Sequence, residues 1–346
     1  MRVLKYLYLA VGMVVLGFVL AETDLAEVGV HVAEVGFGII VLVTIYFIAF
    51  AIDSVTWQMT IRDVPLNLVW AYRAWKLRMV GESFNAVIPA GGMGGEPVKA
   101  VMLKTHYGVD YREGTASLIL AKTINMIALV IFLIAGFALM IQAEALPRAY
   151  EVVAGVGLLA FATGVFLFFV IQRLSITSLT GTWISRWRFA RRVEDILHHI
   201  HDMDDRLVRF YTEDRGRFAG ALVLALVNWL LGAVEIYYTL VFLDNPITWA
   251  EAWIIEAVAQ MVRTGAFFIP AAIGVQEGAF LLVCGAITGS PPVGLAVSVV
   301  RRIREIIWII WGFALGALYS IKSRKAKAET GAQKTGEKAG FPPSRE

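Results

Sequence analysis

The sequence has little charge and almost no cysteine, and each shortage excludes a class of protein. Lys, Arg, Asp and Glu make up 17% of the 346 residues, whereas a soluble domain carries about a quarter. The one cysteine, Cys284, cannot form a disulfide within the chain and provides no cysteine metal cluster. The composition therefore argues against a water-soluble domain and against a scaffold built on disulfides.

Long apolar runs are present instead. Hydrophobic residues make up 58% of the chain, and the mean hydropathy is +0.68. Runs such as 152–171, which contains no charge, reach the roughly 20 residues that a helix needs to cross a bilayer. The sequence therefore predicts an all-α polytopic membrane protein. Six full crossings are expected at residues 4–21, 35–57, 115–141, 152–171, 218–243 and 293–321.

The distribution of basic residues predicts the orientation of these crossings. With the N-terminus in the cytoplasm, 25 of the 31 Lys and Arg residues fall in cytoplasmic segments, five in membrane segments and only Arg148 outside. This bias follows the positive-inside rule, so we expect a multi-pass protein of the cell membrane with both termini in the cytoplasm. A cleaved signal peptide ending near Ala21 is an alternative for the first apolar run.

Two segments outside the crossings are polar. Residues 186–215 combine one apolar stripe at helical spacing with surrounding charge, which predicts a helix on the membrane surface. Within it, "HHIHDMDD" (198–205) has metal-like spacing, although a solvated helix face is the usual explanation. Residues 322–346 contain almost no apolar side chains and are predicted to form a disordered cytoplasmic tail.

One motif occurs twice. The stretches "NAVIPAGGMGGEPVKA" (85–100) and "FIPAAIGVQEGAF" (268–280) both place a glutamate seven residues after the proline of Ile-Pro-Ala. When the sequence is compared with itself at an offset of 181 residues, the two stretches align, and Gly108 aligns with Gly289. The first motif is not a nucleotide-binding loop, because it lacks the Gly-Lys-Ser/Thr ending and no βαβ unit surrounds it.

The surroundings of the two motifs predict an inverted repeat. The stretches 64–112 and 249–289 are too interrupted for one span and too apolar for an aqueous loop. Three crossings separate them, and because three is odd, the first hairpin enters from the cytoplasm and the second from outside. We therefore expect two re-entrant broken-helix hairpins in repeat halves of about 64–141 and 249–321, as in many secondary transporters.

Proline and glycine in these motifs predict hinges inside the bilayer. Proline ends a half-helix and glycine allows a sharp reversal, and the next half-helix begins with free amides that attract an anion. Glu96 and Glu277 are expected to cap those amides. Close helix packing is the alternative explanation for the glycines. The predicted hinge residues are Pro89, Gly91, Gly92, Gly94, Gly95, Pro270, Gly274 and Gly278.

Basic residues near the bilayer midplane predict a binding site. Lys122 lies ten residues after Arg112, which places it roughly 15 Å deep. Arg301 to Arg304 lie at a similar depth from the other face. Each intramembrane charge costs at least ~2.5 kcal/mol, and Glu305 can pair with Arg301 or Arg302 at helical spacing, which leaves an excess of positive charge.

These charges have one functional and two structural interpretations. Because the arginine fork matches phosphate, they indicate a seat for a lipid phosphate. The alternatives are an ion-pair network that holds helices together and a last helix that begins near Ile306, with the arginines at the interface. The predicted substrate-binding residues are Glu96, Lys99, Lys122, Glu277, Arg301, Arg302, Arg304 and Glu305.

Four motifs together resemble the lysylphosphatidylglycerol synthase transmembrane-region family over about residues 1–320. They are "NAVIPAGGMGGEPVKAVMLKTHYGV", "AKT", "IPAAIGVQEGAF" and "AVSVVRRIRE". In fused members of that family this membrane module is taken to translocate an aminoacylated phospholipid that a soluble domain makes. The resemblance implies a stand-alone member without synthase activity. It points first to Glu96, Lys99, Lys122, Glu277, Arg302 and Glu305, although Ala121 stands where relatives often have an acid.

The sequence thus predicts a membrane translocase, or flippase, rather than an enzyme. Its expected cargo is a lipid with a phosphate-bearing head group or a polyprenyl-phosphate-linked sugar. We expect a membrane lipid as partner, no nucleic acid, no cofactor and no metal, with a homo-oligomer left open. The alternatives are a membrane-embedded transferase or accessory subunit that acts on a lipid-linked donor, and a structural scaffold.

Overall fold

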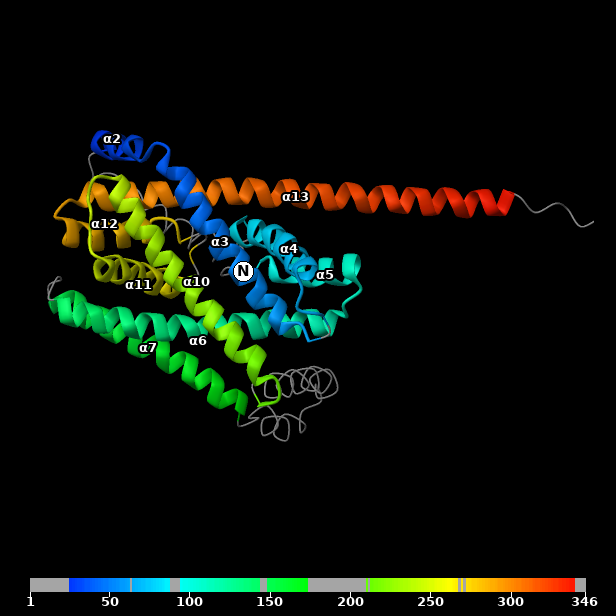
Figure 1. Ribbon diagram of the computed structural model, residues 1–346, viewed down its shortest axis with the longest axis horizontal. Coiled ribbons are helices and arrows are strands. Elements are labelled where there is room, and N and C mark those ends of the chain that lie inside the picture. The colour runs from blue at the N-terminus through cyan, green and yellow to red at the C-terminus, as the bar shows by residue number, and fades with distance from the viewer. Residues whose placement is uncertain are drawn as a thin grey trace, which may run out of the picture.

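The protein is a bundle of helices, shown as a computed structural model in Figure 1. The structure describes residues 25–62, 64–87, 94–143, 148–173, 210, 212–266, 269 and 272–339. Within these ranges it contains helices and no strand, which confirms the all-α fold. The helices are α2 (Leu25–Val35), α3 (Gly38–Thr60), α4 (Leu68–Val87), α5 (Glu96–Tyr107), α6 (Tyr111–Ala143), α7 (Arg148–Arg173), α10 (Arg215–Phe242), α11 (Trp249–Gly265), α12 (Val275–Thr288) and α13 (Pro291–Ala339).

Several helices have the length and composition of membrane spans. Among the described residues, α3, α6 over Tyr111–Gln142, and α10 are long and apolar enough to cross a bilayer. α7 contains the shorter apolar stretch Val152–Leu167. These helices match four predicted crossings, and α13 contains a fifth. The predicted crossing 4–21, with its signal-peptide alternative, lies outside the described residues.

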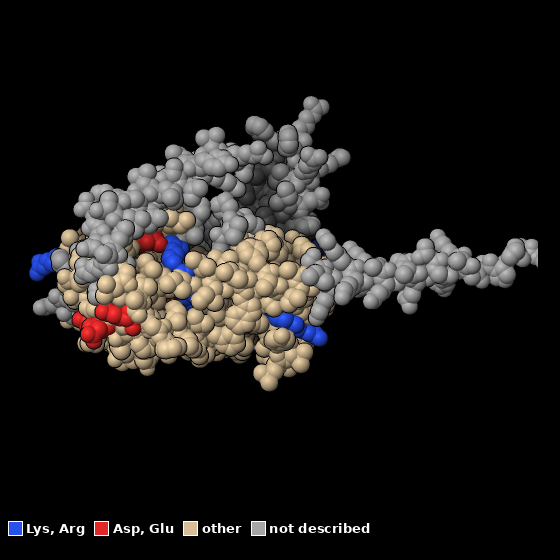
Figure 2. Space-filling view, turned by 90° about the horizontal axis from the view of Figure 1, so that it is seen from above, with Lys and Arg blue, Asp and Glu red and all other residues tan. Residues whose placement is uncertain are grey.

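Large hydrophobic side chains cover much of the outer surface. Ile131, Val153, Leu159 and Ile310, from three different helices, are all exposed. Figure 2 shows a face on which the described charged residues are few and scattered among other residue types. Soluble monomers rarely expose such continuous apolar surface, so this surface is the one expected to contact lipid.

The last helix begins close to the predicted start of its crossing and continues beyond the predicted end. α13 begins at Pro291 and continues through the arginines, so a helix start near Ile306 is wrong. It also continues to Ala339, whereas residues 322–346 were predicted to be disordered. The many Lys, Ala, Glu and Gln residues of this segment have high helix propensity, which accounts for the continued helix.

The predicted surface helix is almost entirely outside the described residues, as is the "HHIHDMDD" stretch within it. Of 186–215, the structure describes only Phe210 and 212–215. Phe210 is buried against α6 and α10, where it packs in a cluster with Leu120, Ile124 and Ala221. The chain therefore meets the bundle again just before α10 begins.

α3 and α10 lie side by side and antiparallel in the bundle (Figure 1). At one end Gly38 lies under the Phe242 ring, where an added Cβ would come within 2.6 Å of the ring. At the other end Arg62 forms an ion pair with Glu213 at 3.3 Å, and Arg217 donates to the Ile61 carbonyl at 3.3 Å. We call these the Gly38 end and the Arg62 end of the bundle.

Two helical hairpins begin at these opposite ends. The α4–α5 hairpin starts at the Arg62 end, where the Gln58 amide donates to the Asn67 carbonyl at 3.1 Å. The α11–α12 hairpin starts at the Gly38 end, where Trp249 stacks on Tyr237 near the end of α10 with ring centroids 3.8 Å apart. The two hairpins therefore extend into the bundle in opposite directions.

The two hairpins also share helix boundaries. α4 begins at Leu68 and α11 at Trp249, which is 181 positions later. α5 and α12 end immediately before Gly108 and Gly289, again 181 positions apart, and both glycines are left-handed, with φ of 72° and 75°. Glycine adopts this conformation without steric cost. The helix contacts are reciprocal as well, since α4 packs on α13 and α11 packs on α6.

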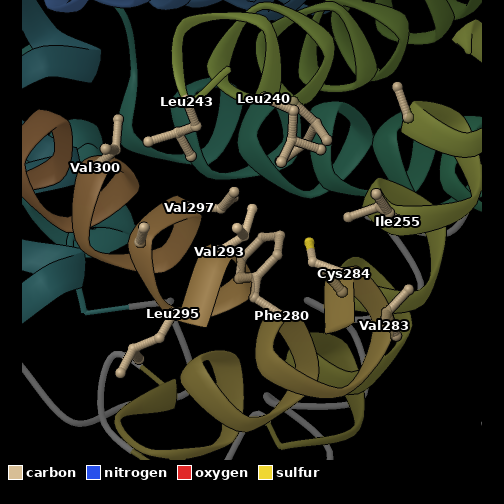
Figure 3. Close-up of a cluster of buried hydrophobic side chains, with 14 of the residues drawn as sticks. Leu240, Leu243, Ile255, Phe280, Val283, Cys284, Val293, Leu295, Val297 and Val300 are labelled. Atoms are coloured by element: carbon tan, nitrogen blue, oxygen red, sulfur yellow. The ribbon is translucent and has the colours of Figure 1, made fainter. Parts of the chain in front are cut away.

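A hydrophobic core holds α13 in register with its neighbours (Figure 3). Phe280, Cys284, Val293 and Val297 are fully or almost fully buried between α10, α11, α12 and α13. Nearby, the α12 backbone approaches α13 so closely that a Cβ on Gly294 would overlap the Phe280 carbonyl.

A second close contact fixes α13 farther along its length. A Cβ on Gly312 would overlap the Met79 carbonyl and the Ser83 hydroxyl of α4. The Ser83 hydroxyl also donates to the Ile309 carbonyl at 3.0 Å. Together with the core around Gly294, this contact holds the intervening arginines of α13 in a defined position.

Candidate functional site

A cavity of about 590 Å³ lies inside the bundle, between the two hairpins and helices α3, α6, α10 and α13. It contains seven of the eight predicted substrate-binding residues. The eighth, Glu277, binds Arg302, which lines the cavity. The charged lining residues are Asp53, Arg78, Glu82, Glu96, Lys99, Lys122, Glu235, Glu256, Arg263, Arg301, Arg302, Arg304 and Glu305.

On the α5 side, one carboxylate holds two lysines. Glu96 begins α5, and its carboxylate lies 2.7 Å from the Lys99 ammonium and 3.5 Å from the Lys122 ammonium of α6. Lys99 is buried and its stem passes over Gly81 of α4. Lys122, in contrast, keeps 49% of its side chain exposed. Lys122 is therefore available to a ligand in the cavity, whereas Lys99 is enclosed.

The start of α5 is capped differently from the prediction. The Gly95 amide donates to Asn85 Oδ1 at 2.7 Å, while Glu96 contacts the two lysines rather than a helix amide. A Cβ on Gly95 would overlap the Gly81 carbonyl, so close backbone approach explains this glycine. Here the packing interpretation of the glycines describes the geometry better than the hinge interpretation.

On the α12 side, Glu277 caps the helix as predicted. Its Oε2 accepts a hydrogen bond from the Gly274 amide at 2.7 Å, and its Oε1 accepts one from Arg302 Nε at 2.8 Å. Gly274 has φ of 80°, a conformation that favours glycine. The Gly278 amide continues the helix by donating to the Gly274 carbonyl at 2.9 Å.

The remaining hinge residues are only partly described. Gly94 lies in a turn immediately before Gly95. Four predicted hinge residues lie outside the described residues, namely Pro89, Gly91, Gly92 and Pro270. Their role as hinges therefore stays a prediction.

Two of the α13 arginines are buried in ion pairs with neighbouring helices. Arg301 Nη2 lies 2.8 Å from Glu256 Oε2 of α11, and Arg304 pairs with Glu235 of α10. Their side chains are only 5% and 4% exposed. Buried pairs of this kind hold helices in register, so the geometry favours the structural alternative for Arg301 and Arg304.

The third arginine has a different environment. Arg302 lies between Glu277 and Glu305, with contacts of 2.8 and 2.9 Å, and its side chain is 23% exposed. Arg263 of α11 approaches the same Glu305 at 3.7 Å and is 42% exposed. Arg302 and Arg263 therefore resemble Lys122, since all three are cations that line the cavity with partly exposed side chains.

Arg263, Arg78 and Asp53 are among the charged lining residues that sequence reasoning did not assign to the site. Arg263 was not among the predicted binding residues, although Glu256 and Gln260 share its face of α11 at helical spacing. Arg78 was counted with the cytoplasmic bases, but the structure places it in the cavity, paired with Asp53 of α3. Asp53 lies within a predicted crossing, and an acid at that position is itself a signal for a functional partner.

The positive excess in the cavity is smaller than expected. Seven bases and six acids line it. The acids beyond the predicted Glu96 and Glu305 are Asp53, Glu82, Glu235 and Glu256, which belong to α3, α4, α10 and α11. Spacing along one helix reveals only partners on that helix, so these acids on other helices could not be assigned to the arginines from sequence.

The helices and the cavity together define a polytopic membrane protein with a charged internal site. The family model for the lysylphosphatidylglycerol synthase TM region matches residues 6–312, and the chain belongs to this family. A UPF0104 membrane protein of Methanothermobacter thermautotrophicus is 23% identical over 296 residues, which cover 81% of this chain and 84% of that protein. No solved structure matches the chain. The family resemblance inferred from the motifs is confirmed.

Proposed function

We propose that the protein is a lipid translocase that moves a lipid with a phosphate-bearing head group between the two leaflets. The observation that carries this proposal is the division of the cavity cations into two kinds. Arg301 and Arg304 are buried in helix-to-helix ion pairs, whereas Lys122, Arg263 and Arg302 remain partly exposed. A network of charges that only joined helices would not need cations whose side chains are partly exposed to the cavity.

The proposed transport path follows from the two hairpins. We take α4–α5 and α11–α12 as the re-entrant elements of an inverted repeat, with halves of about 64–141 and 249–321. Their opposite starting ends and shared boundaries support this arrangement. In such repeats, movement of one half against the other exposes a central site to each side in turn. The head group would occupy the cavity while the acyl chains stay in the bilayer.

The proposed orientation places the Arg62 end in the cytoplasm of the cell. The segments that meet there, around Arg62, Arg112 and Arg217, are those that the distribution of basic residues assigns to the cytoplasmic side. The first hairpin then enters from the cytoplasm and the second from outside. Labelling of single introduced cysteines at each end of the bundle in intact cells tests this orientation.

Transport itself is testable in liposomes. The purified protein is reconstituted with fluorescent phospholipids of several head groups, and an impermeant quencher follows their movement between leaflets. We expect the wild type to accelerate movement of at least one phosphate-bearing lipid and Arg302→Gln to abolish the acceleration. Arg62→Gln, the same change at the bundle end, is the matched control and should remain active. Wild-type rates equal to those of empty liposomes across the panel would refute the proposal.

A further inference from the structure

A single carboxylate, that of Glu305, lies among three guanidinium groups at the cavity. Its Oε2 is 2.9 Å from Arg302 Nη1, and its Oε1 is 3.7 Å from Arg263 Nη1 and 4.0 Å from Arg304 Nη2. Only the first distance is that of a hydrogen bond. Among the described residues, Oε1 has no hydrogen-bond partner although it is shielded from water.

We propose that Arg263 and Arg302 form the seat for the lipid phosphate, and that Glu305 is an internal anion which the phosphate displaces. The proposal rests on the proposed function and specifies which groups recognise the head group. It adds Arg263, a residue of α11, to the binding site. It also assigns Glu305 the role of a competitor rather than a ligand-binding residue.

The unused hydrogen-bonding capacity of the two arginines supports a larger anion at this position. Arg302 donates through Nε to Glu277 and through Nη1 to Glu305, but its Nη2 donates to no described residue. Arg263 reaches Glu305 only at 3.7 Å. A phosphate is larger than a carboxylate and offers more acceptor oxygens, so it can accept from both guanidinium groups at once.

The surroundings allow Glu305 to leave without releasing Arg302. Glu277 holds Arg302 from the opposite side through Nε, and Glu277 is itself held by the Gly274 amide. Glu305 and Arg302 are three residues apart on one helix, and their side chains are 18% and 23% exposed, so this pair is less enclosed than the pairs of Arg301 and Arg304. Glu305 can therefore neutralise the arginines in the empty protein, and Arg302 keeps its contact with Glu277 when a phosphate displaces Glu305.

Binding measurements on the full-length protein in detergent test this competition. The probes are dioctanoyl phosphatidic acid, dioctanoylglycerol as the same lipid without phosphate, and inorganic phosphate. We expect Glu305→Gln to bind the phosphatidic acid about tenfold more tightly than the wild type, because the competing charge is gone. Glu82→Gln is the matched control, since Glu82 lines the same cavity but contacts Asn85, and its affinity should equal that of the wild type.

A second variant separates competition from a general change in charge. Arg263→Gln introduced into the Glu305→Gln protein should remove most of the gain, because one half of the seat is lost. Size-exclusion profiles and thermal unfolding must match the wild type for each variant used. If the double variant binds phosphatidic acid as tightly as Glu305→Gln alone, Arg263 is not part of the phosphate seat.

The remaining outcomes are equally decisive. Unchanged or weaker binding by Glu305→Gln, or equal binding of dioctanoylglycerol, overturns the proposed seat even if the wild type moves lipids in liposomes. Inorganic phosphate that binds as tightly as the lipid overturns the choice of a lipid head group over free phosphate. If the binding pattern holds but no lipid moves between leaflets, the proposed transport function fails and the phosphate seat stands.

Discussion

The buried Arg301–Glu256 pair leads to a prediction that separates structural from ligand-binding charges. Glu256→Gln keeps the size of the side chain and removes its charge. Arg301 then retains its charge in a buried position, 5% exposed, with Glu235 at 4.0 Å as the nearest remaining acid. Because Glu235 already pairs with Arg304, it cannot neutralise both arginines.

The expected loss of stability is large. Breaking a buried ion pair by removing one partner costs about 3–5 kcal/mol, because an uncompensated charge stays buried. The glutamine oxygen can still accept from Arg301, so we expect a value near the lower limit, about 3 kcal/mol. Gln260, which donates to Glu256 Oε1 at 2.7 Å, can keep that contact with the variant.

The double variant Arg301→Gln with Glu256→Gln gives the sharper result. Removing both charges leaves no uncompensated buried charge, because Glu235 still pairs with Arg304, so most of the lost stability should return. Thermal unfolding of the detergent-solubilised protein, followed by tryptophan fluorescence, measures both variants. Arg62→Gln, at an exposed pair, should unfold like the wild type. If the double variant is no more stable than Glu256→Gln alone, Arg301 and Glu256 do not stabilise the protein by neutralising each other.

Two further predictions concern the lysine of α6 and the contact between α4 and α13. Lys122→Gln should slow lipid movement in liposomes about tenfold, the value of one charge-assisted contact to a head group passing through the cavity. It should leave the unfolding temperature nearly unchanged, because the side chain is half exposed, and a large loss of stability would make Lys122 structural. Gly312→Ala should destabilise the protein by about 1–3 kcal/mol, since the new Cβ overlaps the Met79 carbonyl. Gly164→Ala, whose Cβ would meet nothing within 4 Å, is the control, and equal unfolding temperatures for both variants would contradict the overlap.

The cavity uses charge in two ways along one helix. Arg301 and Arg304 point to acids on α10 and α11 and tie α13 to the bundle. Arg302, between them in sequence, meets Glu277 and Glu305 and stays partly open to the cavity. Helical geometry produces this alternation, because adjacent residues on a helix point in different directions.

The class of the protein and most of its helices followed from the sequence alone. Apolar runs of about 20 residues can only be accommodated in a bilayer or a large core, and their length predicted α3, α6 and α10. The repeated Pro-to-Glu spacing predicted where the short helices α5 and α12 begin, to within two residues. These features are local, so backbone chemistry and side-chain hydrophobicity determine them without reference to distant residues.

The tertiary structure determines which acid forms an ion pair with which base. Sequence spacing could pair Glu305 with Arg302, because both lie on one helix. It could not pair Arg304 with Glu235, 69 positions away, or Arg78 with Asp53 on another helix. Helix packing sets those distances, and with them the division between buried, neutralised arginines and the open cations of the cavity. Long-range contacts depend on how helices cross, and the spacing of residues along one helix does not indicate which other helices pack against it.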